Sequence, residues 1–389
     1  MSGYVTDKKK KYTLRGLIAN ILLKVFWLLP IKKKIVFTSY YGKQYSDNPR
    51  CIYEKMRQLR SDIEYVWFMS DKATVKGAKV VPYFSVRAIY HLATSRMWID
   101  NSRKNNWVEK RNGQIYIQTW HGDVCIKMIE KDAAASLGEE YVSAAMNDSS
   151  IADLMISGSK FRSKSYKESF WYSGEILELG TPKSDVLYWD QNAAKQKVCS
   201  HYHLETSLRI ALYVPTFRDS GDISCYSVDY ERVMNTLEKR WGGQWVFIVR
   251  LHPYVQDLKD KVIYTGKVLN GTEYESCDEL IISSDLIITD YSGTMFSGLE
   301  ANKKVLLFAT DYYDYKNERS TYFDIKALPF PFSESNDQLI DNINSFDEKL
   351  YNQECAALKS QLGFFNSAES TDKVVDELLR RFDMFETKK

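Results

Sequence analysis

One stretch of the chain sets the interpretation of its fold: Gln114-Ile115-Tyr116-Ile117-Gln118-Thr119-Trp120, which runs directly into His121-Gly122. Its β-branched and aromatic residues predict a strand that ends at His121. A second strand-like stretch, residues 244–251, ends in the same way at His252-Pro253. Because ligands of open parallel α/β sheets bind beyond the carboxyl ends of the strands, the two histidines predict a site formed by two domains.

A third strand-like run, residues 285–290, leads into Tyr291-Ser292-Gly293-Thr294 and then into a helical pattern. Hydroxyl groups and backbone amides at the start of a helix form a favourable site for phosphate. We therefore predict that Ser292, Gly293 and Thr294 bind a phosphate group.

The remainder of the chain alternates short β-rich runs with helical stretches, which is typical of parallel sheets. Candidate strands are 35–39, 65–68, 97–100, 154–157, 176–179, 210–214 and 305–308, and candidate helices are 49–59, 86–94, 160–170, 230–241 and 373–385. The pattern predicts an α/β protein with two Rossmann-like domains that face a central cleft.

The domain boundaries follow from composition and length. At 389 residues the chain exceeds the size at which single cores stop growing, so two domains are expected. A polar stretch, residues 191–207, separates the halves. We expect a basic amphipathic segment at 1–31, Rossmann-like domains at 32–195 and 205–370, and a C-terminal helix at 371–389.

Charge and cysteine content exclude several classes of function. The net charge is +2, but residues 1–34 hold nine Lys or Arg against one acid, Asp7, so the rest of the chain is mildly acidic. This argues against extended nucleic-acid contact by the body of the protein. The six cysteines form no CxxC pair and no zinc-spaced cluster, which indicates free thiols and no structural metal.

The basic start of the chain also contains an apolar stretch, Leu17 to Leu29. Gly16, Asn20 and Lys24 recur every four residues, so a helix here has one polar face and a wide apolar face that includes Phe26 and Trp27. The stretch is too short and polar to span a bilayer, which takes about 20 apolar residues. We expect it to lie in an anionic membrane surface. The alternative is a helix packed on the protein's own core.

The sequence lacks the common motifs for nucleotide binding and for a catalytic serine nucleophile. It contains no GxGxxG, no GxxxxGK[ST] and no GxSxG. The segment after residues 210–214 places Thr216 and Arg218 at a strand end, and the Arg218 guanidinium is a planar fork suited to phosphate. A salt bridge to a carboxylate is the structural alternative for Arg218.

Six short segments, in this order, resemble those of the CDP-glycerol glycerophosphotransferase family, which makes teichoic acids and related capsules. They are Lys43-Gln44-Tyr45-Ser46-Asp47-Asn48-Pro49, Gln118-Thr119-Trp120-His121-Gly122, Pro215-Thr216-Phe217-Arg218-Asp219, Arg250-Leu251-His252-Pro253, Ile288-Thr289-Asp290-Tyr291-Ser292 and Glu318-Arg319-Ser320-Thr321-Tyr322-Phe323-Asp324. The resemblance covers about residues 33–332. It implies a GT-B fold, a CDP-alditol held mainly by the C-terminal half, and peripheral attachment to the cytoplasmic face of the cell membrane.

The chain departs from that family's pattern beside His121. The family's Thr-Pro-Leu-Lys after the His-Gly pair is replaced by residues 123–127, Asp-Val-Cys-Ile-Lys. Its Tyr-Pro-Arg-Asn-Asp segment corresponds to residues 180–185, Gly-Thr-Pro-Lys-Ser-Asp. We expect Asp47, Gly122, Asp123 and Lys127 to lie on the acceptor side, so these changes bear on acceptor choice.

The favoured hypothesis is transfer of an alditol phosphate, chiefly sn-glycerol 3-phosphate, from its CDP-activated form to a hydroxyl of a lipid-linked glycan or growing polymer. His121 is expected to be the general base, and His252 and Arg218 to stabilise phosphate charge. Thr216 and Asp290 complete the expected donor site, with no cofactor and no metal. Alternatives are a CDP-ribitol transferase, a nucleotide-sugar GT-B enzyme, and a membrane scaffold with a decayed site.

Overall fold

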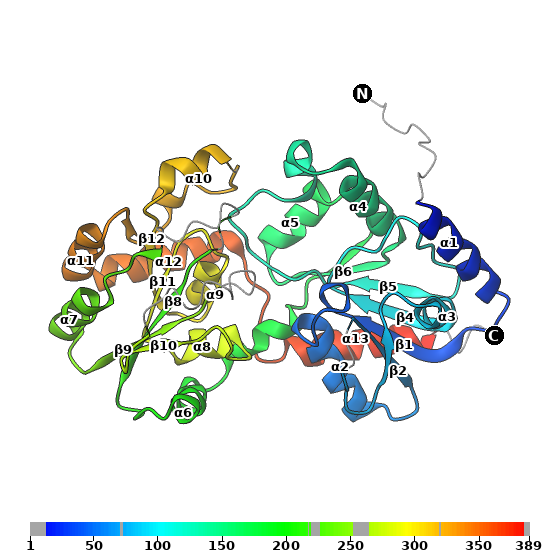
Figure 1. The fold of residues 1–389 in the computed structure, drawn as a ribbon, viewed down its shortest axis with the longest axis horizontal. Coiled ribbons are helices and arrows are strands. Elements are labelled where there is room, and N and C mark those ends of the chain that lie inside the picture. The colour runs from blue at the N-terminus through cyan, green and yellow to red at the C-terminus, as the bar shows by residue number, and fades with distance from the viewer. Residues whose placement is uncertain are drawn as a thin grey trace. The chain divides into compact units, whose positions relative to one another are not determined.

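The computed structural model describes residues 13–70, 73–216, 218, 226–251, 264–318 and 320–384. The chain forms two compact units, each built on its own parallel sheet (Figure 1). One unit comprises Met1–His121, Ile129–Lys183 and Glu369–Lys389, and the other comprises Gly122–Met128 and Ser184–Ala368. The prediction of two Rossmann-like α/β domains is confirmed.

The first unit contains a seven-stranded sheet in the order β3-β2-β1-β4-β5-β6-β7, with every neighbouring pair parallel. Its strands are β1 (Lys32–Thr38), β2 (Glu64–Met69), β3 (Lys79–Pro82), β4 (Ser95–Asp100), β5 (Ile115–Gln118), β6 (Leu154–Ile156) and β7 (Glu175–Leu177). Its helices are α1 (Leu14–Phe26), α2 (Asp47–Leu59), α3 (Val86–Thr94), α4 (Glu139–Ile151), α5 (Lys160–Ser169) and α13 (Ser370–Met384), with short turns η1 (Tyr40–Gly42) and η2 (Glu130–Ser136).

The second unit contains a six-stranded parallel sheet in the order β10-β9-β8-β11-β12-β13. Its strands are β8 (Arg209–Val214), β9 (Trp245–Val249), β10 (Val268–Asn270), β11 (Leu286–Thr289), β12 (Lys304–Phe308) and β13 (Phe332–Ser333). Its helices are α6 (Gln191–Tyr202), α7 (Tyr230–Trp241), α8 (Cys277–Ser283), α9 (Thr294–Glu300), α10 (Tyr312–Glu318), α11 (Asn336–Asn344) and α12 (Glu348–Leu362), and η3 (Pro182–Tyr188) and η6 (Ile325–Ala327) are short turns.

The order of each sheet reverses at one point, between β1 and β4 in the first unit and between β8 and β11 in the second. Crevices for ligands in doubly wound sheets form outside the carboxyl ends of the strands at such a reversal. The loops that follow β1, β4, β8 and β11 are therefore the places where site residues are expected.

The first sheet is buried on both faces, which explains its almost continuous apolar strands. Phe37 and Trp67 pack on one face with α2 and α13. Val36 and Trp98 pack on the other with α1 and α3. The C-terminal helix, expected as a separate element at 371–389, thus completes the core of the N-terminal sheet, because its apolar stripe covers that face.

The polar stretch 191–207 differs from its expected role as a separator. It begins with α6, which is capped by the side chain of Asp190 accepting a hydrogen bond from the backbone N–H of Asn192. Helix α6 packs against α8, and the second unit already begins at Ser184. A polar composition did not prevent a helix here, because Ala194 and Val198 supply enough of an apolar side to bury.

Helix α1 packs with its polar side toward the protein. The Asn20 amide donates to the Trp107 carbonyl at 2.8 Å and to Glu109 at 3.1 Å, and Lys24 pairs with Glu109. Phe26, expected on the membrane side, instead packs with Leu22 against the α3 layer. The outward residues are large and apolar, namely Leu14, Leu17, Ile18, Ile21, Val25, Leu28 and Leu29.

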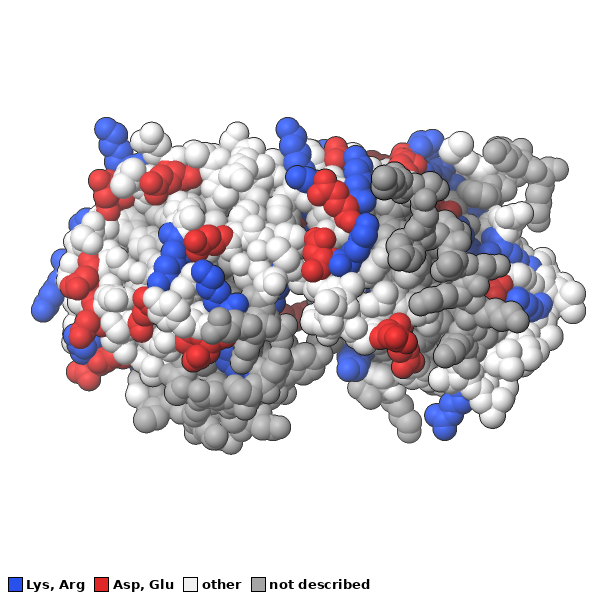
Figure 2. Space-filling model, turned by 90° about the horizontal axis from the view of Figure 1, so that it is seen from above, with Lys and Arg blue, Asp and Glu red and all other residues white. Residues whose placement is uncertain are grey.

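No helix in the described part of the chain has the length and apolar character needed to cross a bilayer. In the face that Figure 2 presents, Lys and Arg side chains are interspersed with Asp and Glu. The five described cysteines carry free thiols.

Candidate active site

The predicted site residues fall into two groups, one in each unit. His121 and Asp47 belong to the first unit, and Thr216, Arg218, Asp290 and residues 292–294 belong to the second. His252 lies outside the described residues, and so do Phe217 and Asp219 on either side of Arg218.

His121 follows the end of β5, and a backbone carbonyl of the neighbouring strand end orients its imidazole. Its Nδ1 lies 2.9 Å from the carbonyl oxygen of Asn101, which follows β4. A carbonyl oxygen only accepts, so Nδ1 carries the hydrogen and Nε2 keeps its lone pair in the neutral ring. The ring stacks on Trp120 with centroids 4.3 Å apart.

The protein favours the neutral form of His121. Although the residue keeps exposed surface, desolvation by the surrounding protein lowers the pKa of His121 below its usual value. Lys183 and Arg162 lower this pKa further, while the Asn101 carbonyl and Asp47 oppose the shift. The ring is thus an available base at neutral pH.

Asp47 begins α2, and its side chain is buried beside His121. Its carboxylate accepts hydrogen bonds from the Tyr40 hydroxyl at 2.9 Å and from the Asn48 backbone N–H at 2.7 Å, and pairs with Lys183 at 3.3 Å. Burial by itself raises the pKa of Asp47, but the Lys183 charge and these hydrogen bonds outweigh it and hold the pKa below its usual value. The Asp47 carboxylate is therefore ionised, and its hydrogen bonds and ion pair hold Tyr40, Asn48 and Lys183 in place.

Asn48 and Lys183 are site residues that the sequence interpretation missed. The Asn48 amide donates to the Trp120 carbonyl at 3.3 Å and accepts from the Lys183 backbone N–H at 3.0 Å. The Lys183 ammonium donates to the His121 carbonyl at 3.2 Å. Asn48 was visible as the neighbour of Asp47 in a family-like segment, and Lys183 as the basic residue of the altered 180–185 segment.

Several residues around His121 and Asp47 have a left-handed backbone conformation. Tyr40, Tyr41, Asp47 and Trp120 have φ values of 46°, 57°, 63° and 54°. Such a conformation in a non-glycine residue costs of order 1–3 kcal/mol and persists only where the surroundings over-determine it. The hydrogen bonds to Asp47 and to the Trp120 carbonyl supply that constraint, which is typical of a functional site.

In the second unit, Arg218 lies between two carboxylates. It pairs with Asp290 at 2.8 Å and with Asp311 at 2.5 Å, and it donates to the Thr216 carbonyl at 2.6 Å. Asp290 also accepts from the backbone N–H groups of Thr216 and Tyr291. The geometry matches the salt-bridge alternative for Arg218. Asp311, three residues after β12, was not predicted, although its strand-end position was a signal.

The turn that was predicted to bind phosphate leads into α9. The Ser292 hydroxyl lies 2.9 Å from the Thr294 hydroxyl and accepts from the Thr294 backbone N–H at 3.2 Å. A Cβ on Gly293 would come within 3.3 Å of the Val124 carbonyl oxygen. Glycine is therefore suited to this position because there is little room for a side chain, and not because the backbone needs a positive φ.

The segment after His121, Gly122–Met128, belongs to the second unit. Met128 N–H donates to the Ser320 carbonyl at 3.0 Å, and Tyr322 N–H donates to the Ile126 carbonyl at 2.8 Å. Lys127 thereby forms an antiparallel β-bridge with Thr321. The Lys127 ammonium lies 5.6 Å from the centre of the Tyr315 ring. A Cβ on Gly122 would meet no atom within 4 Å, so the space beside it is open.

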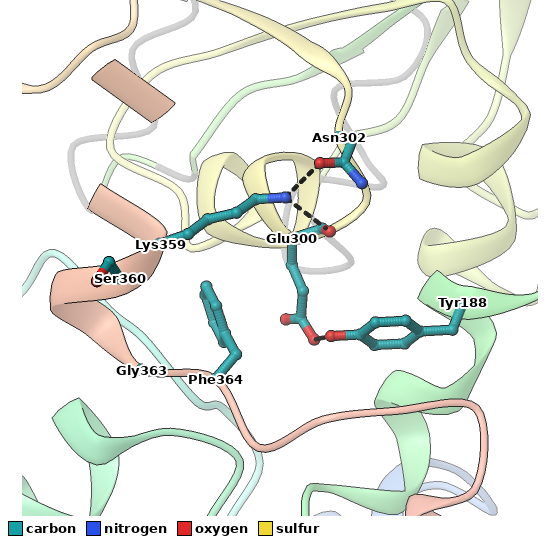
Figure 3. Close-up of a pocket in the computed structure, with 7 residues that line it drawn as sticks. All are labelled: Tyr188, Glu300, Asn302, Lys359, Ser360, Gly363 and Phe364. Atoms are coloured by element: carbon teal, nitrogen blue, oxygen red, sulfur yellow. Dashed lines mark hydrogen bonds between the residues drawn. The ribbon is translucent and has the colours of Figure 1, made fainter. Parts of the chain in front are cut away.

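Two cavities lie in the second unit. The larger, of about 430 Å³, is lined by Tyr188, Glu300, Asn302, Lys359, Ser360, Gly363 and Phe364 (Figure 3). The Tyr188 hydroxyl donates to the Glu300 carboxyl at 2.9 Å. Burial, reinforced by the Asp123 charge, raises the pKa of Glu300 to about 8. None of the expected site residues lines this cavity.

The smaller cavity, of about 200 Å³, is lined by Ile126, Tyr291, Tyr312, Tyr315, Lys316, Thr321, Tyr322, Phe323, Asp324 and Ile325. It adjoins the turn at residues 292–294, since Tyr291 directly precedes Ser292. Among the described residues, no three His, Cys, Asp or Glu side chains gather as a metal site.

A sequence profile of the family described as CDP-Glycerol:Poly(glycerophosphate) glycerophosphotransferase matches residues 21–380. The chain belongs to this family. A teichoic acid poly(glycerol phosphate) polymerase of Bacillus spizizenii is 26% identical over 93% of this chain and 96% of its own length. A teichoic acid poly(ribitol-phosphate) polymerase of the same organism is 26% identical over 91% of this chain, which spans 58% of that relative.

Solved structures agree with this membership of the glycerophosphotransferase family. The structure of the wall teichoic acid polymerase TagF matches with a TM-score of 0.81 and 25% identity, covering 95% of this chain and 97% of that one. The similarity therefore extends over both units.

Proposed function

We propose that this glycerophosphotransferase family member transfers an alditol phosphate, chiefly sn-glycerol 3-phosphate, from a CDP-activated donor to a hydroxyl of a lipid-linked glycan or growing polymer. Family membership across residues 21–380 is the observation that carries the proposal. The neutral, oriented imidazole of His121 supports it, because phosphoryl transfer to an alcohol benefits from a base at the attacking oxygen.

The chemistry assigned to His121 is proton removal. Nε2 takes the proton of the acceptor hydroxyl as its oxygen attacks the β-phosphorus of the donor. The bond between that phosphorus and the oxygen bridging to the α-phosphate breaks, and CMP leaves with the electron pair. The alditol phosphate is then joined to the acceptor as a phosphodiester.

The second unit is the proposed donor side. The amides and hydroxyls of Ser292, Gly293 and Thr294 would seat a phosphate, and His252 would stabilise its developing charge. Arg218 is already engaged by Asp290 and Asp311. These ion pairs hold the two strand ends together, and a bound phosphate would compete with the two carboxylates for the guanidinium.

Helix α1 is the proposed membrane contact, at the cytoplasmic face where a lipid-linked acceptor is found. Five large apolar residues of the helix and two that directly follow it, Leu28 and Leu29, are exposed, and its polar side is satisfied by the protein through Asn20, Lys24 and Glu109. This orientation favours the membrane hypothesis over a helix whose apolar face is buried in the core. The neighbouring Lys32 and Lys33 supply the basic component of such attachment.

A ribitol donor is the second candidate, because a poly(ribitol-phosphate) polymerase and a poly(glycerol phosphate) polymerase are equally identical to this chain. The test is incubation with CDP-glycerol, CDP-ribitol or UDP-sugars and a lipid-linked acceptor in vesicles. We expect CMP release from one CDP-alditol only when the acceptor is present. UDP release from a UDP-sugar would overturn the proposal in favour of an ordinary glycosyltransferase.

The same assay tests the expectation that no metal is required. Transfer should continue in EDTA, with a rate close to that in magnesium. Loss of activity in EDTA that magnesium restores would show that a cation takes part.

A further inference from the structure

A buried arginine of the first unit contacts the same tryptophan ring as His121. Arg103 lies in the loop after β4, and only 3% of its surface is exposed. Its guanidinium carbon lies 5.2 Å from the centre of the Trp120 ring and 5.0 Å from that of the Phe170 ring, within the range of cation–π attraction. The His121 imidazole stacks on Trp120 with ring planes 29° apart. The Trp120 ring is thus in contact with both the imidazole and the guanidinium.

Two buried carboxylates hold the Arg103 guanidinium. One terminal nitrogen donates to Glu130 at 2.5 Å, and the other donates to Asp148 at 2.9 Å and to the Ser149 hydroxyl at 3.1 Å. The three charged side chains are each at most 2% exposed. Burial lowers the pKa of Arg103, but the charges of Asp148 and Glu130 outweigh it and raise the pKa above its usual value. The guanidinium therefore stays charged, with its planar fork fixed between the two carboxylates.

Asp148 extends this network to the loop that orients the imidazole. Its other carboxylate oxygen accepts from the Lys104 backbone N–H at 2.8 Å, three residues after Asn101. Asn101 supplies the carbonyl that lies 2.9 Å from the imidazole. The Gln118 amide donates to Asp148 at 3.2 Å and accepts from the Trp120 backbone N–H at 2.9 Å. Asp148 thus connects the guanidinium both to the Asn101 loop and to the backbone of Trp120.

We propose, on the basis of the general-base role assigned to His121 above, that Arg103 is a positioning residue for the transfer reaction. Its guanidinium holds the Trp120 ring on which the imidazole stacks. Through Asp148 it also holds the loop whose carbonyl fixes the proton on Nδ1. The stack sets the plane of the imidazole, and the carbonyl sets which nitrogen is left to accept the proton of the acceptor hydroxyl. Because Arg103 is buried, it acts through these groups and not on the substrate.

Stability alone is a weaker explanation for this network. Taking an arginine and two carboxylates out of water costs free energy that offsets their attraction, so well-packed apolar residues often stabilise a protein as well as a buried ion pair does. The guanidinium of Arg103 supplies in addition a rigid plane with several donors in a fixed geometry. A lysine carries the same charge without that fork. Replacing arginine with lysine therefore separates the effect of geometry from the effect of charge.

The experiment measures two properties of Arg103→Lys. The first is the tautomer of His121 at neutral pH without substrate, observed by NMR of protein that carries isotopically labelled histidine. A His121→Ala sample identifies the His121 signals among those of the five histidines. The second is the separate change of kcat and of KM for the CDP-alditol, measured by CMP release. Thermal melting establishes that each variant is folded. Glu130→Gln, which keeps the shape of a carboxylate partner and removes its charge, serves if Arg103→Lys does not fold.

The matched control is Arg60→Lys in the same unit. Arg60 also pairs with two carboxylates, Asp62 and Asp383, each at 2.8 Å. It follows the last residue of α2, whereas Asp47, beside the imidazole, begins that helix. The control therefore replaces the same guanidinium fork at a position away from His121.

We expect the wild type to show one neutral tautomer of His121, with the proton on Nδ1, and Arg103→Lys to show exchange between both tautomers. Its kcat should fall by up to about 100-fold, the cost of a misplaced reacting group, while KM for the CDP-alditol stays within about twofold. Arg60→Lys should change neither property. Retention of the single wild-type tautomer in Arg103→Lys would overturn the proposal, and so would an equal loss of kcat in Arg60→Lys.

Failure of the proposed function gives a different result. Wild-type protein that releases no CMP from any CDP-alditol would overturn the transferase assignment. The tautomer measurement uses no substrate, so it would still decide whether Arg103 orients the His121 imidazole.

Discussion

Nδ1 of His121 lies 2.9 Å from the backbone carbonyl oxygen of Asn101. Asn101 directly follows β4, at the point where the strand order of the first sheet reverses. The neighbouring strand therefore supplies a rigid acceptor that fixes both the tautomer and the direction of the ring. The group that orients the His121 imidazole as a base is thus a backbone carbonyl, which a motif of side chains cannot reveal.

His121→Ala should abolish transfer and leave donor binding largely intact, because the base acts on the acceptor oxygen. Loss of one general base costs about 10²–10⁴ in rate. The measurement is CMP release alongside calorimetric titration with CDP-glycerol. Turnover within a few-fold of the wild type would remove His121 from the mechanism.

The pH dependence of the rate should carry the signature of the His121 environment. Since desolvation lowers the pKa of His121, the acid limb of kcat/KM should lie below the usual histidine value of about 6.5. Lys183→Gln removes a charge that lowers this pKa and should move the limb to higher pH. Asp47→Asn removes a charge that raises it and should move the limb to lower pH. Shifts in the same direction in both variants would contradict the assignment.

Asn48 should act as a positioning residue. Asn48→Ala leaves the Trp120 carbonyl and the Lys183 backbone N–H without their partner, which costs about 1–3 kcal/mol of unfolding free energy for buried groups. We expect kcat to fall as well, measured by CMP release. The control is Asn342→Ala, whose amide donates to Phe332 and Ser333 in the second unit. An equal loss of kcat in the control would indicate general destabilisation.

Replacing the outward residues Ile18, Ile21 and Val25 with Ser should release the protein from anionic liposomes without lowering its melting temperature. All three side chains are about half exposed, so the protein core is not disturbed. The control replaces three equally exposed residues on other helices with Ser, namely Leu59, Met146 and Leu350. Flotation that survives the α1 replacements would place the membrane contact elsewhere. Higher salt should weaken binding only in part, because apolar burial is not screened.

Glu300 should make stability depend on pH. Its pKa is raised to about 8 by burial, so the folded protein binds a proton that the unfolded chain loses near pH 4.5. Stability from this group is present at low pH and falls as pH rises toward 8, by at most about 1.4 kcal/mol per unit. Glu300→Gln should flatten this slope in chemical denaturation at pH 5, 6.5 and 8. The control Glu348→Gln, at an exposed position, should leave the slope unchanged.

Most of the secondary structure could be predicted because the local signals were strong. The helices at 86–94 and 230–241 have the predicted bounds, since periodic apolar residues and the caps Ser85 and Asp229 coincide with them. The sequence also placed His121, Asp290 and the turn at residues 292–294 just beyond strand ends, where the structure has them. The stretch 191–207 was misjudged, because a few small apolar residues were enough to seat α6 on α8.

The sequence by itself determined the α/β class, the two Rossmann-like units and the family, since all three depend on patterns along the chain. Only the tertiary structure decided which side chains complete the site. In the first unit, strand order and loop closure bring the Asn101 carbonyl and the Lys183 side chain to His121, and in the second unit they bring Asp311 to Arg218; a linear pattern does not encode either. The direction of α1 was decided in the same way: Asn20 turned inward beside Leu23 because Trp107 and Glu109 offered hydrogen bonds there, and a buried polar group without such partners is costly.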